Sequence, residues 1–276
     1  MAREQKSRAP RAFCVFRLPM ISYLSTTSVS GRPFMTPGAH GGIMSRTTVI
    51  AGVGPGLGES LAERFTAEGC SVALLARSES YLETLAERLR SETPGEALAV
   101  PTDLSDPLTI DHAFERVHES FGPVDVLVNH ASAASWDGLL EQDRGAFRRA
   151  LSVGPEAAMH CSQTAVEDML DTGGGTVIFT GATTSVRGRE GAVGFSAAKF
   201  ACRGLAESMA RELGPEGVHV AHVVIDGGIL PPDADVDDEA DYLDPDAVAD
   251  AYWTLVEQDR SAWTLELDLR PHVESF

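Results

Sequence analysis

Lysine, cysteine and long apolar runs are scarce in this sequence. Its 276 residues contain no apolar segment near the ~18–20 residues that a membrane-spanning helix needs, so no membrane partner is expected. The four cysteines form no Cys-x-x-Cys pair, which argues against a zinc site and against a disulfide framework. They are Cys14, Cys70, Cys161 and Cys202. This usage indicates a reduced, intracellular setting, and the length suits one large domain.

Basic residues are scarce in one part of the chain. Residues 1–43 hold six basic residues and one acidic residue, whereas residues 44–276 hold 16 basic and 40 acidic residues, a formal charge of −24. Only one of those 16 is a lysine, Lys199. Salt-adapted cytoplasmic proteins have such acidic surfaces, because high salt screens the self-repulsion. We therefore predict a halophilic source and a cytoplasmic location. No basic stripe exists, which argues against a nucleic-acid partner.

Residues 1–43 show neither helical nor strand periodicity. Their Arg- and Ser-rich, acid-poor composition resembles an organellar transit peptide, which would place the protein in an organelle. The alternative is a start codon set too far upstream, with Met44 as the true first residue. The salt-adapted body favours this alternative. We therefore expect an N-terminal extension over 1–43, either disordered or a mis-assigned start, and a single domain over 44–276.

Strand-like and helix-like stretches alternate from Thr47 onward. The apolar, strand-like runs are 47–51, 71–76, 97–100, 124–128, 176–180, 218–225 and 263–269. Helical periodicity marks the stretches between them, including a long one over 141–170 that is interrupted near Gly154-Pro155. Further helices are expected over 192–213 and 246–258. The pattern predicts an α/β fold: a doubly wound, mostly parallel Rossmann-type sheet of about seven strands with helices on both faces.

A glycine-dense turn follows the first predicted strand. It reads Gly52-Val53-Gly54-Pro55-Gly56-Leu57-Gly58, with the spacing G-x-x-x-G-x-G. Glycine permits unusual backbone angles and lets a phosphate approach the main chain closely. The helix after the turn offers unpaired N–H groups and a positive dipole end to a pyrophosphate. The turn therefore predicts a dinucleotide site.

Further residues extend this pattern. Asp103-Leu104 follows the third predicted strand, Asn129-x-Ala131 follows the fourth, and Lys199 lies on the helix over 192–213. With the glycine turn, they resemble the short-chain dehydrogenase/reductase family over residues 46–269. The resemblance implies that Asp103 hydrogen-bonds adenine, that Asn129 holds the central sheet at the cofactor, and that Lys199 binds the nicotinamide ribose. From the residues alone, Asp103 could instead cap a helix, Asn129 could shape a loop and Lys199 could be a surface lysine. The resemblance also implies a homodimer or homotetramer, since relatives are commonly dimers or tetramers built on the helices that correspond to 141–170 and 192–213.

The end of the second strand bears on the choice of cofactor. Ala76 stands where an NAD-binding chain places a carboxylate for the ribose hydroxyl, and Arg77 and Ser78 follow it. An arginine there can pair with a 2′-phosphate and has no acid beside it. NADP(H) is therefore favoured over NAD(H), and the alternative is that Arg77 is only a surface residue.

The catalytic half departs from the family pattern of Asn, Ser, Tyr and Lys. Phe195 stands four residues before Lys199, in the tyrosine position. Ala182 falls in the serine position and Gly154 in the asparagine position. No other tyrosine replaces the missing one, because none lies between residues 82 and 241. The tyrosines are Tyr23, Tyr81, Tyr242 and Tyr252. Ordinary carbonyl reduction should therefore be severely impaired, since loss of a general acid lowers a rate by ~10²–10⁴.

Several polar residues are candidates for the missing proton transfer. Thr183, Thr180 and Ser196 carry hydroxyls near the expected site. His130 follows Asn129 and could donate a proton near neutral pH, although a packed histidine is the commoner case. Asp226 ends the sixth strand; we expect it beside the nicotinamide, with a pKa raised by burial, unless it only caps the turn.

Two functions remain open. The first is an NADP(H)-dependent oxidoreductase that acts on a small carbonyl or alcohol with non-standard proton transfer. The second is a catalytically weak NADP-binding sensor or regulatory subunit. The acidic run 233–241 lies where relatives carry a substrate lid, and it is either that lid or a solvated loop.

Overall fold

Seven parallel strands form the central sheet of the described residues, in the order β3-β2-β1-β4-β5-β6-β9. The computed structural model describes residues 45–232, 236 and 238–274. The strands are β1 (Thr47–Ala51), β2 (Ser71–Ala76), β3 (Glu96–Pro101), β4 (Val126–Asn129), β5 (Gly175–Thr180), β6 (Val218–Ile225) and β9 (Glu266–Leu269). Two short strands, β7 (Gly228–Ile229) and β8 (Tyr242–Leu243), pair apart from them. The predicted fold class is confirmed.

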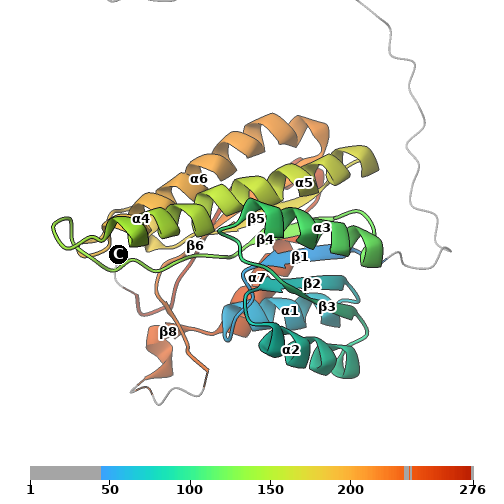
Figure 1. The fold of residues 1–276 in the computed structure, drawn as a ribbon, viewed down its shortest axis with the longest axis horizontal. Coiled ribbons are helices and arrows are strands. Elements are labelled where there is room, and N and C mark those ends of the chain that lie inside the picture. Colours follow the sequence, from blue (N-terminus) through green and yellow to red (C-terminus); the bar gives the residue numbers. More distant parts are fainter. Residues whose placement is uncertain (1–44, 233–235, 237, 275–276) are drawn as a thin grey trace, which may run out of the picture. The chain divides into compact units, whose positions relative to one another are not determined.

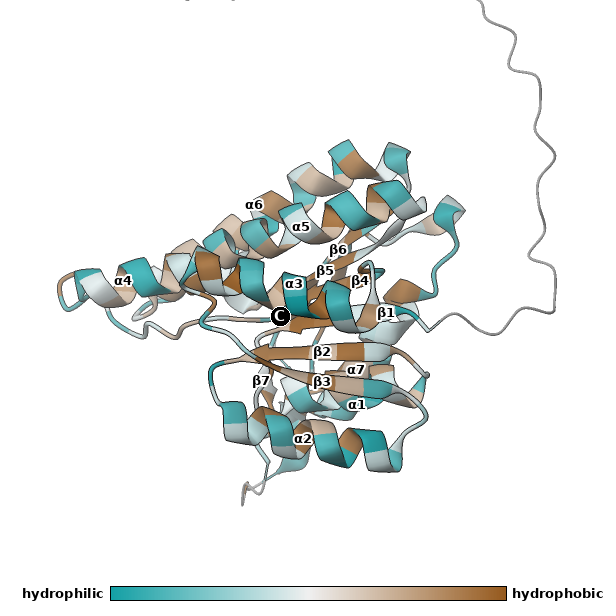
Figure 2. Cartoon of the chain, turned by 45° about the vertical axis from the view of Figure 1, so that its right-hand side comes forward, coloured by the Kyte–Doolittle hydropathy of each residue, from teal (hydrophilic) through white to brown (hydrophobic). Residues whose placement is uncertain are grey.

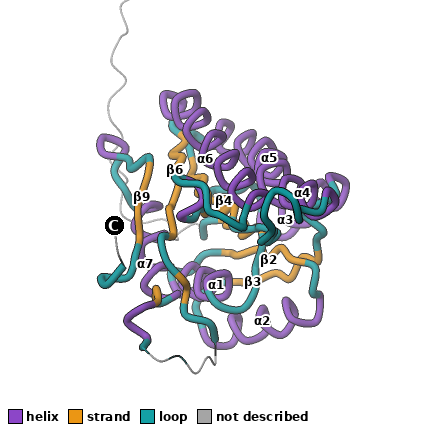
Figure 3. The backbone as a smooth tube through the Cα atoms, turned by 90° about the vertical axis from the view of Figure 1, so that its left-hand side faces the viewer, coloured by secondary structure: helices purple, strands orange, loops and turns teal. Residues whose placement is uncertain are grey.

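Helices cover both faces of this sheet (Figure 1). They are α1 (Leu57–Ala67), α2 (Glu79–Glu92), α3 (Pro107–Phe121), α4 (Arg144–Leu151), α5 (Ala157–Thr172), α6 (Val193–Leu213) and α7 (Pro245–Val256). Helices α1, α2 and α7 lie on one side, and α3 to α6 lie on the other. Figure 3 shows α7 close to α1, and β9 beside β6. Within the part of the chain that is described, every helix is too short or too polar to cross a membrane.

The strands are apolar because both of their faces are buried. Along β1, Ile50 packs into the core under α1, α2 and α7, whereas Val49 and Ala51 pack into the core under α3, α5 and α6. Successive side chains of a strand point to opposite faces, so a strand between two helical layers must be apolar throughout. Figure 2 shows brown strands between helices whose outer faces are largely teal.

The interruption predicted at Gly154-Pro155 is a π-helical turn, Ser152–Glu156, between α4 and α5. Proline lacks the N–H that an α-helix would use at this position and crowds the preceding turn. One wider turn accommodates it, and the chain then continues as α5.

The last predicted strand is shorter in the structure than the run 263–269. Trp263 stacks on His219 with ring centroids 4.9 Å apart, and its indole N–H donates to the carbonyl of Gln258. These contacts hold the segment before β9 as a loop. Apart from such ends, the expected strands and helices are present. The expectations for residues 1–43 and for 233–235 and 237 lie outside the described residues.

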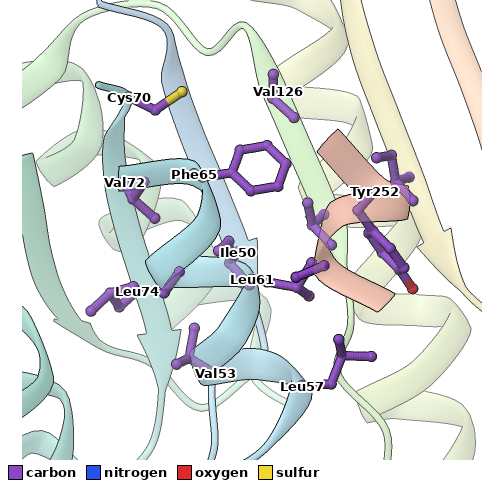
Figure 4. Packing of buried hydrophobic residues seen from close by; sticks show 14 of the residues in the cluster. Ile50, Val53, Leu57, Leu61, Phe65, Cys70, Val72, Leu74, Val126 and Tyr252 are labelled. Atoms are coloured by element: carbon purple, nitrogen blue, oxygen red, sulfur yellow. The ribbon is translucent and has the colours of Figure 1, made fainter. Parts of the chain in front are cut away.

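Phe65 is fully buried in the core shown in Figure 4. Its ring meets Trp253 of α7 edge to face, with centroids 5.3 Å apart. The contact joins α1, which follows the glycine turn, to a helix almost two hundred residues later in the chain.

We expect Phe65→Ala to lower the free energy of unfolding by about 3–5 kcal/mol, because it empties a fully buried site. Urea denaturation measures this change. Leu140→Ala is the control, since Leu140 is 92% exposed, and it should change stability by less than about 0.5 kcal/mol. Equal effects of the two substitutions would contradict the packing described here.

Candidate functional site

Two cavities open where β1 and β4 end. The strand order reverses direction between these neighbours, which is where open parallel sheets bind ligands. The first cavity, about 520 Å³, is named the glycine crevice; its lining includes Gly52, Gly54, Ala76, Arg77, Asp103, Leu104, Ala131 and Arg149. The second, about 880 Å³, is named the lysine pocket; its lining includes Trp136, Thr180, Ala182, Thr183, Phe195, Lys199 and Asp226. His130 and Ser132 line both cavities.

The glycine turn is shaped by a close approach between β1 and β4. Gly52 has φ +108°, and a Cβ added to it would lie 2.5 Å from the Cα of Ala131. Only glycine fits this position. Gly54 faces open space, since a Cβ there would meet nothing within 4 Å. The turn therefore leaves bare backbone at the crevice wall.

The rest of the predicted turn builds the start of α1. Gly56 is the N-cap, with φ +91°, and its carbonyl accepts from the backbone N–H of Ser60. Leu57 is buried in the core, and a Cβ on Gly58 would lie 3.1 Å from the Cα of Val53. Pro55, Gly56, Leu57 and Gly58 lie outside the crevice lining among the described residues.

Arg77 and Asp103 line the glycine crevice together. Asp103 accepts from the backbone N–H and the hydroxyl of Ser105, at 3.0 and 2.7 Å. These bonds, and more weakly Arg77 and Arg149, lower the pKa of Asp103. The cap of α3 is Asp106 instead, so the helix-cap alternative for Asp103 is wrong. Ser78 is the N-cap of α2, and its side chain makes no capping bond.

Asn129 holds the sheet to the helical layer. Its side chain is buried at the end of β4, and Nδ2 donates to the hydroxyl of Ser162 on α5 at 3.0 Å. Its Oδ1 is buried without a partner among the described residues. Two residues later, the N–H of Ala131 donates to the carbonyl of Ala51, which closes the loop against β1.

Lys199 is buried, with 5% of the residue exposed. Its Nζ donates to the backbone carbonyl of Thr180 at 2.8 Å. Burial lowers the pKa of this ammonium group. Because Lys199 is buried, the surface-lysine alternative is wrong. Burying a cation is costly unless polar groups hold it, and the Thr180 carbonyl is such a group.

The aromatic side of the lysine pocket carries no hydroxyl. The Phe195 ring lies 4.7 Å from Trp136, centroid to centroid, and Lys199 Nζ lies 5.6 Å from the Phe195 centroid. Ala182 lines the same pocket, and no tyrosine is among the described lining residues. Gly154 lies in the π-helical turn, beside a void of about 10 Å³ and outside both large cavities.

Thr183 and Asp226 are hydrogen-bonded to each other in the lysine pocket. The Thr183 hydroxyl donates to Asp226 Oδ1 at 2.6 Å. Arg187 and Arg270 approach the same carboxylate, at 3.5 and 3.2 Å. Both predicted residues therefore reach the pocket, and Asp226 is an ion-pair partner there. Its role as an acid stays a prediction.

His130 is connected to Tyr252 through Thr180. Its Nδ1 lies 3.1 Å from the hydroxyl oxygen of Thr180, which also accepts from the Tyr252 hydroxyl at 2.9 Å. Burial, and secondarily the charge of Lys199, lowers the pKa of His130 to about 4. The imidazole is therefore neutral at neutral pH.

The glycine crevice therefore opens onto the lysine pocket. A family profile described as short chain dehydrogenase matches residues 46–235. The chain belongs to the short-chain dehydrogenase family. The match covers the glycine turn, the Asp103 loop, Asn129 and Lys199.

Relatives and solved structures agree with this assignment. Meso-2,3-butanediol dehydrogenase of Serratia marcescens is 32% identical over 179 residues, 65% of this chain and 70% of the relative. A short-chain dehydrogenase structure from Rhodopseudomonas palustris is 32% identical with TM-score 0.72, covering 82% of this chain and 99% of that chain. An alcohol dehydrogenase from the archaeon Thermococcus sibiricus, complexed with 5-hydroxy-NADP, is 25% identical with TM-score 0.77, covering 84% and 98%.

The sequence pattern did not indicate two residues of this short-chain dehydrogenase site, Arg149 and Tyr252. Arg149 of α4 lines the glycine crevice with Arg77, although its sequence position only suggests a helix surface. Tyr252 lies on α7, far along the chain from the strand ends, and its hydroxyl donates to Thr180 at the end of β5. No local pattern marks either contact, because both depend on how distant helices pack.

We expect the stability of this short-chain dehydrogenase to fall as the pH drops from about 6.5 to about 4. In that range the unfolded chain protonates His130 but the folded chain does not, so the unfolded state binds more protons. The contribution is roughly 1.4 kcal/mol per pH unit. Burial also lowers the pKa values of His219 and His222, which act in the same direction.

Urea denaturation across this pH range measures the slope. His130→Asn should reduce it, whereas the control His112→Asn, at an exposed position of α3, should leave it unchanged. A slope that is identical in wild type and His130→Asn would contradict the low pKa of His130.

Proposed function

We propose that this protein is an NADP(H)-dependent oxidoreductase that acts on a small carbonyl or alcohol with non-standard proton transfer. One observation carries the proposal: His130 and Ser132 line both cavities, so the glycine crevice and the lysine pocket meet. A dinucleotide that lies along the crevice can therefore reach the lysine pocket with its far end.

The crevice has the chemistry that a dinucleotide requires. The bare backbone at Gly52 and Gly54 allows phosphates to approach, and α1 begins directly after it. Arg77 and Arg149 supply guanidinium groups near Asp103. A guanidinium pairs well with a 2′-phosphate, which supports NADP(H) over NAD(H). When bound, the nicotinamide supplies or accepts the hydride.

The residues of the pocket would orient the reactants. Lys199, fixed by the Thr180 carbonyl, would hydrogen-bond the nicotinamide ribose, as the family resemblance implies. Phe195 and Trp136 form an apolar wall that excludes water from one side of a substrate. We infer that Phe195, Ala182 and Gly154 occupy the family's Tyr, Ser and Asn positions, so the usual proton donor is missing. Thr183, whose hydroxyl donates to Asp226 in the same pocket, is a candidate to replace it.

A second candidate is an NADP-binding sensor with little turnover. The packing of Phe195 between Trp136 and Lys199 favours it, because an apolar ring fills the place from which a hydroxyl would donate. Both candidates predict nucleotide binding, and only the first predicts turnover. A panel of small carbonyls and alcohols, assayed at high salt with NADPH or NADP⁺, therefore separates them.

Arg77→Ala should weaken NADPH binding about 10- to 100-fold, since charged hydrogen bonds contribute roughly 1.5–3 kcal/mol. NADH binding should change far less, because NADH lacks the 2′-phosphate. Nucleotide fluorescence titration measures both dissociation constants. Arg116→Ala, at an exposed position of α3 outside the crevice, is the control. If Arg77→Ala weakened the binding of NADPH and NADH equally, Arg77 would not contact the 2′-phosphate.

Phe195→Tyr combined with Ala182→Ser should raise carbonyl reduction by about 10²–10⁴-fold, because it restores a positioned proton donor beside Lys199. Initial rates of NADPH oxidation on the panel measure the gain. Phe195→Leu is the matched control, since it opens the same space without a hydroxyl. If the double variant gains nothing over wild type, Phe195 and Ala182 do not occupy the positions proposed here.

A further inference from the structure

We propose that His130 donates a hydrogen bond from its Nε2–H to the reacting oxygen of the substrate, and that Tyr252 and Thr180 hold the imidazole in this tautomer. This assignment rests on the proposed function. It makes His130 a catalytic residue and Tyr252 a positioning residue.

His130 lies where the two cavities meet. It lies at the carboxyl end of β4 and is the one ionisable side chain that lines both cavities among the described residues. The junction of a dinucleotide crevice and a substrate pocket is where a hydride would be exchanged. Thr180 brings His130 and Lys199 together, since its hydroxyl bonds the first and its carbonyl accepts from the second.

The hydrogen bonds of Tyr252 and Thr180 determine which nitrogen of His130 carries the proton. Tyr252 is fully buried and donates its one hydroxyl proton to Thr180 Oγ1. Figure 4 shows the oxygen of Tyr252 on the side of the ring away from Phe65. With that bond accepted, the single proton of Thr180 is available for His130 Nδ1. An imidazole that accepts at Nδ1 and is neutral carries its proton on Nε2.

The imidazole of His130 carries no charge at neutral pH. Burial and the nearby Lys199 keep His130 neutral at neutral pH, and burial raises the pKa of Tyr252, which therefore keeps its proton. Lys199 is the charged group that acts on the imidazole. Nε2 has no hydrogen-bond partner among the described residues, so its N–H remains for a ligand. A fixed neutral imidazole N–H can stabilise charge on a substrate oxygen without being reorganised.

The step balances without a tyrosine. The carbonyl carbon receives a hydride with its electron pair from a reduced nicotinamide, which is thereby oxidised. The π pair of the C=O bond moves to oxygen, where His130 Nε2–H stabilises the alkoxide. A water molecule then protonates the alkoxide, and the hydroxide leaves to solvent. His130 ends the step with the proton it began with.

Long-range ¹H–¹⁵N correlation spectra of the full chain with labelled histidine test the tautomer directly, before any nucleotide is added. His130→Asn assigns the signal by its loss. We expect the Nε2–H tautomer for His130 at neutral pH. Tyr252→Phe and Thr180→Val should shift the signal toward a mixture with Nδ1–H. Tyr81→Phe is the matched control, because its hydroxyl bonds Glu59 at the surface and should leave the signal unchanged. A neutral Nδ1–H form, a charged imidazolium, or a signal unmoved by both variants would overturn the proposal.

Kinetics on any substrate found in the panel test the catalytic part. His130→Leu should lower kcat about 10²–10³-fold with little change in the KM for NADPH, and His130→Gln, which keeps an N–H donor, should restore part of the loss. Equal kcat values for His130→Leu and wild type would overturn the assignment. NADPH titration of the same samples separates the two proposals. If the wild-type protein does not bind NADPH, the proposed function is rejected. If it binds NADPH but His130 has the wrong tautomer, only the role of His130 is rejected.

Discussion

The close approach of the β1 and β4 loops is the constraint on which the site depends. Gly52 can face Ala131 at this distance only because it lacks a Cβ. The approach brings the glycine turn, Asn129 and His130 to one edge of the sheet. From there the crevice runs toward Arg77 and the pocket toward Lys199. A side chain at Gly52 would force the two loops apart.

Thr180 is the second fixed point, because it serves both faces of the sheet. Its carbonyl holds Lys199, and its hydroxyl joins His130 to Tyr252. The same residue thus orients the ammonium group of Lys199 and the imidazole of His130. Because the Phe195 ring of the pocket carries no hydroxyl, a polar group already fixed in place can contribute more to binding a substrate oxygen.

Much of the fold was predictable because its signals are local. Strands buried on both faces must be apolar throughout, and a helix needs a repeating apolar stripe. The apolar runs at β1, β2 and β6 therefore predicted the bounds that these strands have in the structure. The start of β9 was not predictable, since Trp263 stacks on His219, a residue distant in the sequence, and so lies outside the strand. For the same reason Arg149 was missed, because its place in the crevice depends on the orientation of α4.

By itself, the sequence determined the parallel α/β fold, the glycine turn and the family, since each is carried by residue types at short, fixed spacings. It also determined that Phe195, and not a tyrosine, precedes Lys199. Only the tertiary structure decided that Lys199 is buried, that Asp226 is paired with two arginines, and that Tyr252 bonds Thr180. These contacts join residues that are far apart in the sequence. Their distances depend on layer packing, which no local pattern encodes.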